Sequence, residues 1–418
     1  MIWEGILDIQ AFNPETDREA GRRIWEEVGW LDRNEKNEVI GHDAYVDAGR
    51  GLVTRIDGEV ECMVLAAGGS LRYLGEDVTF SGVTGVTTSR VARRQGFAAR
   101  MTARLIAEET DAGAATSGLG MFEQGFYNRL GYGTGVYETW MAFDPQLLKV
   151  PFPTRPPKRL AQEDWEKVHA CRLRRRLHHG SVSFDSPLMT KGHRMESPKT
   201  FGLGFYDEAD GNLSHHVWIT PGEGENGPYE VAWMTYQSPE QYMELLGVLR
   251  TLGDQVRMIR MFEAPGIQLQ DFLDQPLQNR MITFQTKFET GAKVLAFWQI
   301  RICKLEECLA RTKLRSGEAR FNLQLSDPIT KHLDATTEWQ GAGGDYVVTL
   351  GKESGAEPGA DASLPTMKAS VNAFSRLWLG VRPATGLAIT DELGAPQELL
   401  EELDWVLRLP VPIRDWDF

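Results

Sequence analysis

Apolar and polar positions alternate along most of the first 145 residues, and a helical period interrupts this alternation at a few places. The segment 13–15, Asn-Pro-Glu, favours a helix start, because it supplies a capping side chain, a fixed φ and a negative charge. Asp57-Gly58 lies between two alternating runs and predicts a tight hairpin. The predicted strands cover 60–66, 70–74, 78–88, 115–119 and 134–143, and the predicted helices include 13–28 and 124–130.

A further helical pattern follows a basic turn near residue 95. Phe97, Met101 and Leu105 recur one turn apart and predict an amphipathic helix. The turn before it, 93–98, carries two arginines and a glycine directly after a strand. A helix start in this setting leaves backbone N–H groups unpaired beside a positive dipole, which suits a phosphate or pyrophosphate. Taken alone, these residues fit an arginine-rich surface turn better than a phosphate site.

Two shifts in composition divide the chain into three parts. Four prolines within 151–157 forbid a helix and favour an extended linker. After Phe288 the pattern is helical to about residue 314 and then strand-rich. The predicted domains are therefore 1–150, 151–295 and 296–418, in an α/β chain.

Composition and charge narrow the class of function. Of the 418 residues, 42% are hydrophobic and 25% charged, as in ordinary globular proteins, and the net charge of −14 disfavours nucleic acid and anionic membranes as partners. No apolar run is long enough to span a bilayer, and the first residues lack a signal-peptide pattern, so we expect a cytoplasmic protein. Four scattered cysteines and two pairs of adjacent histidines show no ligand spacing, so no metal site is expected.

Two segments resemble a known family. Arg93-x-x-Gly96-x-Ala98 resembles motif A of the GNAT acetyltransferases, which holds the pyrophosphate of acetyl-CoA. The segment EQGFYNRLGYG at 123–133 is similar to the E-x-x-(I/F)-Y-x-R-(F/L)-G-Y-G segment of the enhanced intracellular survival (Eis) acetyltransferases. Together with the proline linker and the length, the resemblance covers the whole chain. It implies two tandem GNAT-like domains, the second one cofactor-free, followed by a sterol-carrier-protein-like α+β domain.

The resemblance also implies a site for acetyl-CoA as co-substrate. The strand backbone at 86–88 would pair with the pantetheine arm, and the N–H groups of 94–99 would hold the pyrophosphate. Phe122 stands where the family usually has a small serine, so it can reshape the pocket near the thioester. The implied cofactor-binding residues are Val86, Thr87, Thr88, Arg94, Gln95, Gly96, Phe97, Ala98, Ala99, Phe122 and Glu123.

Two catalytic groups follow from the same resemblance. Tyr127 is implied as the proton donor to the leaving thiolate, although a tyrosine taken without the motif fits a space-filling aromatic far better. The α-carboxylate of Phe418 is implied as the base. The tail at 413–418 is acidic and aromatic, which is typical of a packed terminus, so docking onto its own domain stays open as an alternative.

The acceptor and the assembly are the least specified. Glu26, Trp30 and Asp417 could contact a cationic amine through charge and cation–π attraction, while a solvated helix face explains the glutamate as well. The resemblance implies an N-acetyltransferase for aminoglycoside, polyamine or lysine-type amines, assembled as a homohexamer. The alternative hypothesis is a lipid or acyl-CoA binding protein without turnover.

Overall fold

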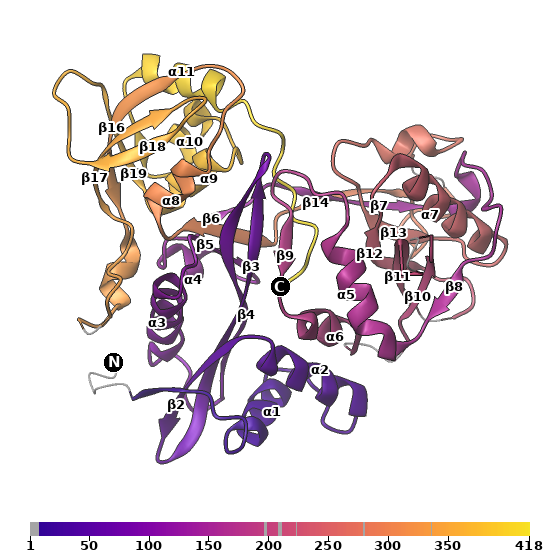
Figure 1. Ribbon diagram of the computed structural model, residues 1–418. Helices are drawn as coiled ribbons and strands as arrows, with labels where there is room; N and C mark the ends of the chain where they lie inside the picture. Colours follow the sequence, from indigo (N-terminus) through magenta and orange to yellow (C-terminus); the bar gives the residue numbers. More distant parts are fainter. Residues whose placement is uncertain (1–7, 196–198, 208–210, 223, 279–280, 336) are drawn as a thin grey trace. The chain divides into compact units, whose positions relative to one another are not determined.

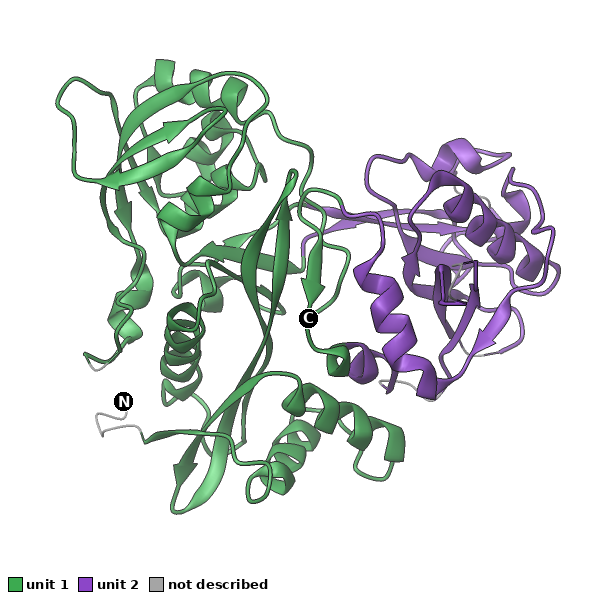
Figure 2. Cartoon of the chain, viewed as in Figure 1, with its two compact units in different colours: residues 1–136, 178–189, 297–418 green, residues 137–177, 190–296 purple. Residues whose placement is uncertain are grey.

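The computed structural model describes all residues except 1–7, 196–198, 208–210, 223, 279–280 and 336 (Figure 1). The chain forms two compact units, each built from separate stretches of sequence (Figure 2). Unit 1 comprises residues 1–136, 178–189 and 297–418, and unit 2 comprises 137–177 and 190–296. No helix among the described residues combines the length and the apolar character needed to cross a membrane.

The first sheet of unit 1 carries the N-terminal part of the chain. Its strand order is β1-β2-β3-β4-β5-β15-β6, with β9 added to β3. Neighbours are antiparallel except β4 and β5, which are parallel. The strands are β1 (Ile9–Ala11), β2 (Arg50–Ile56), β3 (Glu59–Tyr73), β4 (Glu76–Thr88), β5 (Thr116–Gly120), β6 (Gly133–Thr134), β9 (Val182–Phe184) and β15 (Trp298–Ile302).

Helices cover both faces of this sheet because successive residues of β3 point to opposite sides. Cys62 and Val64 pack in a core with α3 (Phe97–Asp111), whereas Met63 and Leu65 pack in a core with α1 (Arg18–Glu27). The remaining helices of this region are α2 (Lys36–Asp47) and the short α4 (Gln124–Asn128).

Unit 2 repeats the same sheet topology. Its order is β8-β10-β11-β12-β13-β7-β14, again with a single parallel pair, β12 with β13. The strands are β7 (Glu138–Phe143), β8 (Lys158–Leu160), β10 (Phe201–Phe205), β11 (His215–Pro221), β12 (Tyr229–Thr235), β13 (Ile259–Phe262) and β14 (Gly291–Leu295). The helices are α5 (Trp165–Leu173), α6 (Pro187–Met195) and α7 (Pro239–Thr251), with 3₁₀ turns at η1 (Pro145–Leu147), η2 (Gln162–Asp164), η3 (Leu252–Asp254) and η4 (Leu269–Phe272).

The two sheets exchange strands. The chain leaves β6 at the edge of the first sheet and continues as β7 inside the second. It later leaves β14 at the edge of the second sheet and returns as β15 inside the first. The divisions predicted at 150 and 295 therefore do not coincide with the limits of the compact units, because each sheet takes one inner strand from beyond them. The three-domain division itself stays a prediction.

A third sheet, also in unit 1, has the order β18-β17-β16-β19-β20. Its strands and helices share one buried core, which includes Phe321 and Leu323 from β16 and Trp378 from α9. The elements are β16 (Ala319–Ser326), η5 (Pro328–His332), β17 (Gly344–Leu350), β18 (Gly355–Pro358), β19 (Thr366–Ser370), β20 (Leu393–Gly394), α8 (Leu305–Ala310), α9 (Val371–Trp378), α10 (Ala384–Thr390) and α11 (Gln397–Val406). The chain is thus a mixed α/β protein with two equivalent sheets and a third α+β part, whose likeness to a sterol carrier protein stays a prediction.

Four local predictions differ from the observed elements. The segment after Phe288, predicted to be helical to about residue 314, first forms strands β14 and β15, and helix α8 follows only at Leu305. The apolar side chains of β15 are buried inside the first sheet, a long-range pairing that a local pattern cannot indicate. The strands predicted at 60–66 and 70–74 are one continuous strand, β3, because the glycines between them do not break it. A Cβ atom at Gly69 would lie 2.0 Å from the carbonyl oxygen of Ser183, so this glycine lets β9 approach. The strand predicted at 134–143 is divided between the two sheets, and α2 was not predicted.

Candidate active site

Strands β4 and β5 separate at a bulge in the middle of the first sheet. They pair from Phe80 with Thr116 to Val83 with Leu119, and β4 then continues to Thr88 paired with β3 but not with β5. At the same point Thr84 is skipped in the pairing of β4 with β3. The Thr84 hydroxyl oxygen is buried and has no hydrogen-bond partner among the described residues. The opening exposes backbone groups along one edge of β4, which an extended amide-containing chain can pair with.

The turn after β4 points its backbone at the same opening. Arg94 and Gly96 adopt left-handed conformations, with φ values of 60° and 84°. Alternation of this kind turns successive N–H groups to one side and forms an anion-binding concavity at the start of α3. In the part of the chain that the structure describes, the N–H groups of Gly96, Ala98 and Ala99 donate no hydrogen bond.

Several of the predicted cofactor-binding residues have side chains that already make contacts within the protein, which leaves mainly their backbone for a ligand. The Phe97 side chain is buried in the core under α3, so only its backbone faces the turn. Gln95 donates to the carbonyl oxygen of Val91 at 2.9 Å and closes the turn. Thr87 and Thr88 direct their hydroxyl groups toward Met63 and Cys62 of β3. These residues can therefore serve a pyrophosphate and a pantetheine arm mainly through their backbone, as can Val86, Arg94, Gly96, Ala98 and Ala99, which line the same strand end and turn.

Phe122 and Glu123 lie beyond the end of β5. The Phe122 side chain is 81% exposed. The Glu123 carboxylate accepts hydrogen bonds from the backbone N–H groups of Gly125, at 3.0 Å, and Phe126. Glu123 is thus the N-cap of α4. Its side chain positions the helix that follows rather than offering a free group to a ligand.

Tyr127 sits on α4, one turn after this cap. It is 4% exposed and packs edge-on against Phe126 and Tyr132. Burial, together with the nearby Glu123 carboxylate, raises the pKa of Tyr127 to about 12. The hydroxyl group makes no hydrogen bond within the described residues, although the buried hydroxyl of Tyr132 bonds to Ser117 at 2.7 Å. Tyr127 therefore carries a proton at neutral pH that is not held by another side chain.

The carboxyl end of Phe418 lies at the end of β5. Its oxygen accepts a hydrogen bond from the backbone N–H of Gly120 at 3.1 Å. The ring packs against Phe80 and Phe184, with centroids 5.4 and 5.6 Å away, and a Cβ at Gly118 would lie 3.2 Å from it. The last residue thus lies where β4 and β5 begin to separate.

A segment from the middle of the chain holds this tail. The backbone N–H of Ile413 donates to the carbonyl oxygen of His179, and the Asp415 carboxylate accepts from the Ser181 hydroxyl and the Val182 N–H. Figure 1 shows the C-terminus beside β9. The sequence offered no signal for this arrangement, because the contacting residues are more than 200 positions apart.

The predicted acceptor residues are exposed. Glu26 lies on the exposed side of α1, and Trp30 is 47% exposed with its ring edge-on to Trp25, 5.4 Å away. The Asp417 side chain is 58% exposed and pairs with Arg414 at 3.0 Å. Trp25 connects α1 to the site, since its ring lies 3.4 Å from where a Cβ of Gly85 would be. All three side chains are therefore accessible to a ligand.

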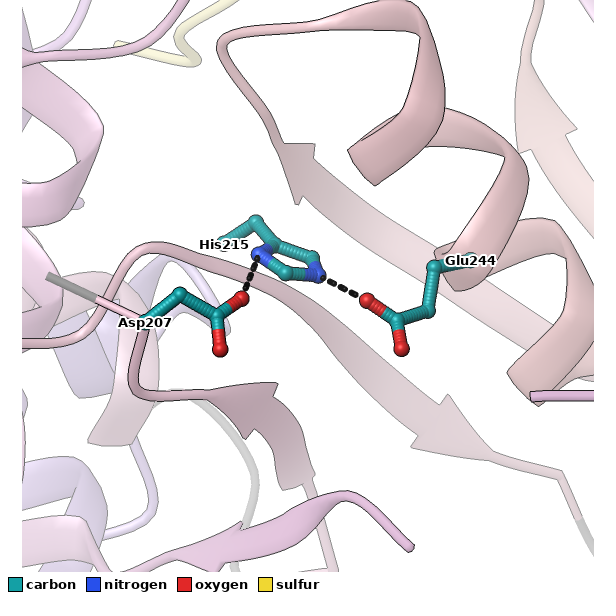
Figure 3. A group of neighbouring side chains, drawn as sticks. All are labelled: Asp207, His215 and Glu244. Atoms are coloured by element: carbon teal, nitrogen blue, oxygen red, sulfur yellow. Dashed lines mark hydrogen bonds and ion pairs between the residues drawn. The ribbon is translucent and has the colours of Figure 1, made fainter. Parts of the chain in front are cut away.

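One group of described side chains has the spacing of a metal site, Asp207, His215 and Glu244 in unit 2 (Figure 3). His215 lies between the two carboxylates, 3.0 Å from Glu244 and 3.8 Å from Asp207. Both carboxylates also pair with Arg155, which sets a positive charge beside them. These side chains form an ion-pair network that is remote in sequence from the strand opening.

Comparison with known proteins identifies relatives of this fold. Residues 13–135 match the family model of the GNAT acetyltransferase domain. No curated protein sequence matches the chain. Among solved structures, a probable N-acyltransferase from Enterococcus faecalis superposes with a TM-score of 0.78 at 17% identity, covering 99% of this chain and 100% of that one. A GCN5-related N-acetyltransferase from Anabaena variabilis has a TM-score of 0.78 at 13% identity, with the same coverage.

The same whole-chain likeness extends to Eis1 from Mycobacterium abscessus, with a TM-score of 0.75 at 16% identity over 99% of this chain and 100% of that one. At these identities the likeness is one of fold. The matched segment contains the strand opening, the turn before α3 and Tyr127. Residues 13–135 are therefore an acetyltransferase domain of the GNAT family, and the whole chain shares its fold with the GCN5-related N-acetyltransferase from Anabaena variabilis and with Eis1.

Proposed function

We propose that the protein is an acetyl-CoA-dependent N-acetyltransferase of the Eis type, which transfers acetyl directly to an amine in a ternary complex. One observation carries the proposal: Tyr127 packs in one core with Val83 of β4 and Leu119 of β5, and the Phe418 carboxyl group binds Gly120 at the end of β5, where β4 and β5 open. Acetyl transfer to an amine needs a base for the ammonium proton and an acid for the leaving thiolate.

The residues around the opening fit acetyl-CoA. The free edge of β4 and the buried, unpartnered Thr84 hydroxyl suit the amides of a pantetheine arm. The left-handed turn at Arg94 and Gly96 suits a pyrophosphate, and the α3 dipole adds positive charge. When bound, acetyl-CoA supplies an activated thioester for attack by the amine.

The proton path uses two groups of this chain. The Phe418 carboxylate accepts the proton of the attacking amine, which at pH 7 arrives almost wholly as an ammonium. The Gly120 N–H holds that carboxylate in place. Tyr127 donates its proton to the departing thiolate, and its raised pKa keeps it protonated across the working range.

A cationic acceptor fits the charges at the mouth of the site. Glu26 and Asp417 are exposed carboxylates, and the exposed Trp30 ring offers cation–π attraction. We extend the proposal to polycationic amines of the aminoglycoside, polyamine or lysine type.

Among the described residues of unit 2, the start of α7 does not repeat the turn that we propose binds the cofactor in unit 1. Strand β12 leads to α7 through Ser238, whose hydroxyl caps the helix by accepting from the Gln241 N–H, and Pro239 at the first helical position has no N–H to offer. The helix start is therefore already satisfied. We propose that unit 2 binds no acetyl-CoA.

Exposed apolar side chains in unit 2 support assembly with further copies. Met281, Ile282 and Phe284 are 99%, 91% and 51% exposed. Side chains of this kind are commonly buried between subunits. We propose a homo-oligomer, a hexamer by resemblance to the Eis family, which sedimentation analysis of the full chain tests.

The activity is tested by thiol release from acetyl-CoA with a panel of aminoglycosides, polyamines and lysine peptides. We expect release with at least one class, and a kcat lower by ~100-fold in Tyr127→Phe with acetyl-CoA affinity unchanged. The matched control is Tyr137→Phe, because Tyr137 is 58% exposed and lies outside the site. Acetyl-CoA binding without release from any amine would contradict the proposal and favour a binding protein.

A further inference from the structure

The part of unit 1 from residue 297 onward hydrogen-bonds to the loop that follows α4, residues 128–132. The Asn372 side chain, from α9, donates to the carbonyl oxygen of Asn128 at 2.8 Å and to that of Tyr132 at 2.7 Å. The first acceptor lies on the last residue of α4, where helix carbonyls have no partner of their own. One amide from a distant segment thus ties together the two ends of the loop directly after Tyr127.

A buried ion pair holds the middle of the same loop. The Arg301 guanidinium, on β15, donates to the carbonyl oxygen of Leu130 and pairs with Asp327 at 2.7 Å. Both side chains are completely buried. The Asp327 carboxylate also accepts from the N–H groups of Ile329 and Ala342, so the pair is fixed on both sides. Hydrogen bonds to charged groups are stronger in a buried, low-dielectric setting, so this pair holds the carbonyl group of Leu130 in place.

Two glycines, Gly131 and Gly133, allow the close approach of Arg301 and Asn372 to this loop. A Cβ at Gly131, where φ is 83°, would lie 2.7 Å from an Arg301 nitrogen. A Cβ at Gly133 would lie 2.4 Å from the carbonyl oxygen of Asn372. The Gly-Tyr-Gly segment recognised in the sequence therefore marks the surface on which the C-terminal part closes.

A five-residue helix has little stability of its own, so its position depends on what holds its ends. Glu123 caps one end of α4 and Asn372 binds the other. Building on the proposed role of Tyr127, we propose that Asn372 is a positioning residue for acetyl transfer, which holds α4 so that the Tyr127 hydroxyl reaches the leaving thiolate. The C-terminal part of the chain thereby shapes the active site through α4 as well as through its tail.

A double-mutant cycle tests this role. Asn372→Ala and the isosteric Asn372→Asp remove the donor, and we expect kcat to fall ~10-fold with the KM for acetyl-CoA within ~2-fold. In a Tyr127→Phe background the same substitutions should change kcat by less than ~2-fold, because the group that they position is gone. Equal losses in both backgrounds would overturn the inference.

Two controls separate this result from simpler explanations. Gln397→Ala, on α11, removes an exposed amide that bonds to Glu401 at 2.8 Å, and it should leave kcat and its Tyr127 dependence unchanged. If Tyr127→Phe itself keeps full activity, the proposed acid fails before any Asn372 variant is measured. If Tyr127→Phe loses activity while both Asn372 variants keep theirs, the positioning role alone fails.

Discussion

At the scale of single residues, the proposed site combines the Tyr127 hydroxyl and the Phe418 carboxylate, whose surroundings differ. Tyr127 is nearly buried, and its proton is harder to remove than that of a free tyrosine. The Phe418 carboxyl group accepts a hydrogen bond from one backbone N–H, that of Gly120. The proposed acid thus keeps its proton at neutral pH, as donation to a leaving thiolate requires.

The pH dependence of kcat follows from Tyr127. Because burial raises its pKa to about 12, the acid keeps its proton through the range in which a free tyrosine, with a pKa of 10.0, would lose it. We expect kcat at saturating substrates to stay level from roughly pH 9 to 11. The measurement is a pH–rate profile with circular dichroism as a control for folding. A decline with an apparent pKa near 10 would contradict it.

His179 predicts a stability change on the acidic side. Burial lowers its pKa to about 4, from 6.5, while its ring accepts from the Leu74 N–H and lies 3.0 Å from the Leu379 carbonyl oxygen. The lowered pKa means that the stabilising contribution is complete above pH 6.5 and is lost as the pH falls toward 4. The contribution of His179 to the free energy of unfolding amounts to up to about 3 kcal/mol. Urea unfolding across this range should show the loss in the native chain and not in His179→Gln.

At the scale of elements, the pattern of the sequence predicted α1, α3, α4 and strands β2 to β5 of the first sheet, but not β1, β9 or β15. It predicted the turn before α3 as well, because glycine and helix-start signals are local. It divided β3, since a glycine that admits a neighbouring strand looks the same in sequence as one that ends a strand. The α2 segment has almost no amphipathic period, so the pattern contained little to reveal it.

The turn before α3 allows a controlled test of cofactor binding. Gly96 and Gly58 have nearly equal φ values, 84° and 88°, so alanine at either position should cost about 1 kcal/mol of folding free energy. Gly58 lies in the β2–β3 hairpin, away from the opening. We expect calorimetry to show acetyl-CoA binding weakened ~10-fold in Gly96→Ala and unchanged in Gly58→Ala. Equal affinities would show that the turn does not bind the pyrophosphate.

At the scale of the whole molecule, the exchange of strands makes the first sheet depend on distant sequence. Trp298, Ile300 and Ile302 of β15 are almost completely buried between β5 and β6. The contacts of Phe418 with Gly120, and of Asp415 with Val182, are of the same long-range kind. Periodicity and local motifs do not indicate contacts between residues that are far apart in sequence. The fold class could therefore be predicted, whereas the contacts of the C-terminal tail at 413–418 could not.

Truncation tests this dependence. A chain ending at residue 150 contains the whole segment that matches the GNAT model but lacks β15 and β9. We expect it to show neither a cooperative thermal transition nor protected amides in β5, because one side of that strand loses its partner. A cooperative transition in the truncated chain would show that the first sheet folds without the C-terminal segment.

The proposed base of the acetyl-transfer site is the α-carboxylate of Phe418. The most direct measurement compares thiol release from acetyl-CoA by the native chain with release by the same chain carrying three residues appended after Phe418. The appended peptide converts the carboxylate beside Gly120 into an amide, which cannot accept the ammonium proton. We predict a kcat ~100-fold lower with acetyl-CoA affinity unchanged. Equal release from both chains would contradict the claim and assign the base to another group.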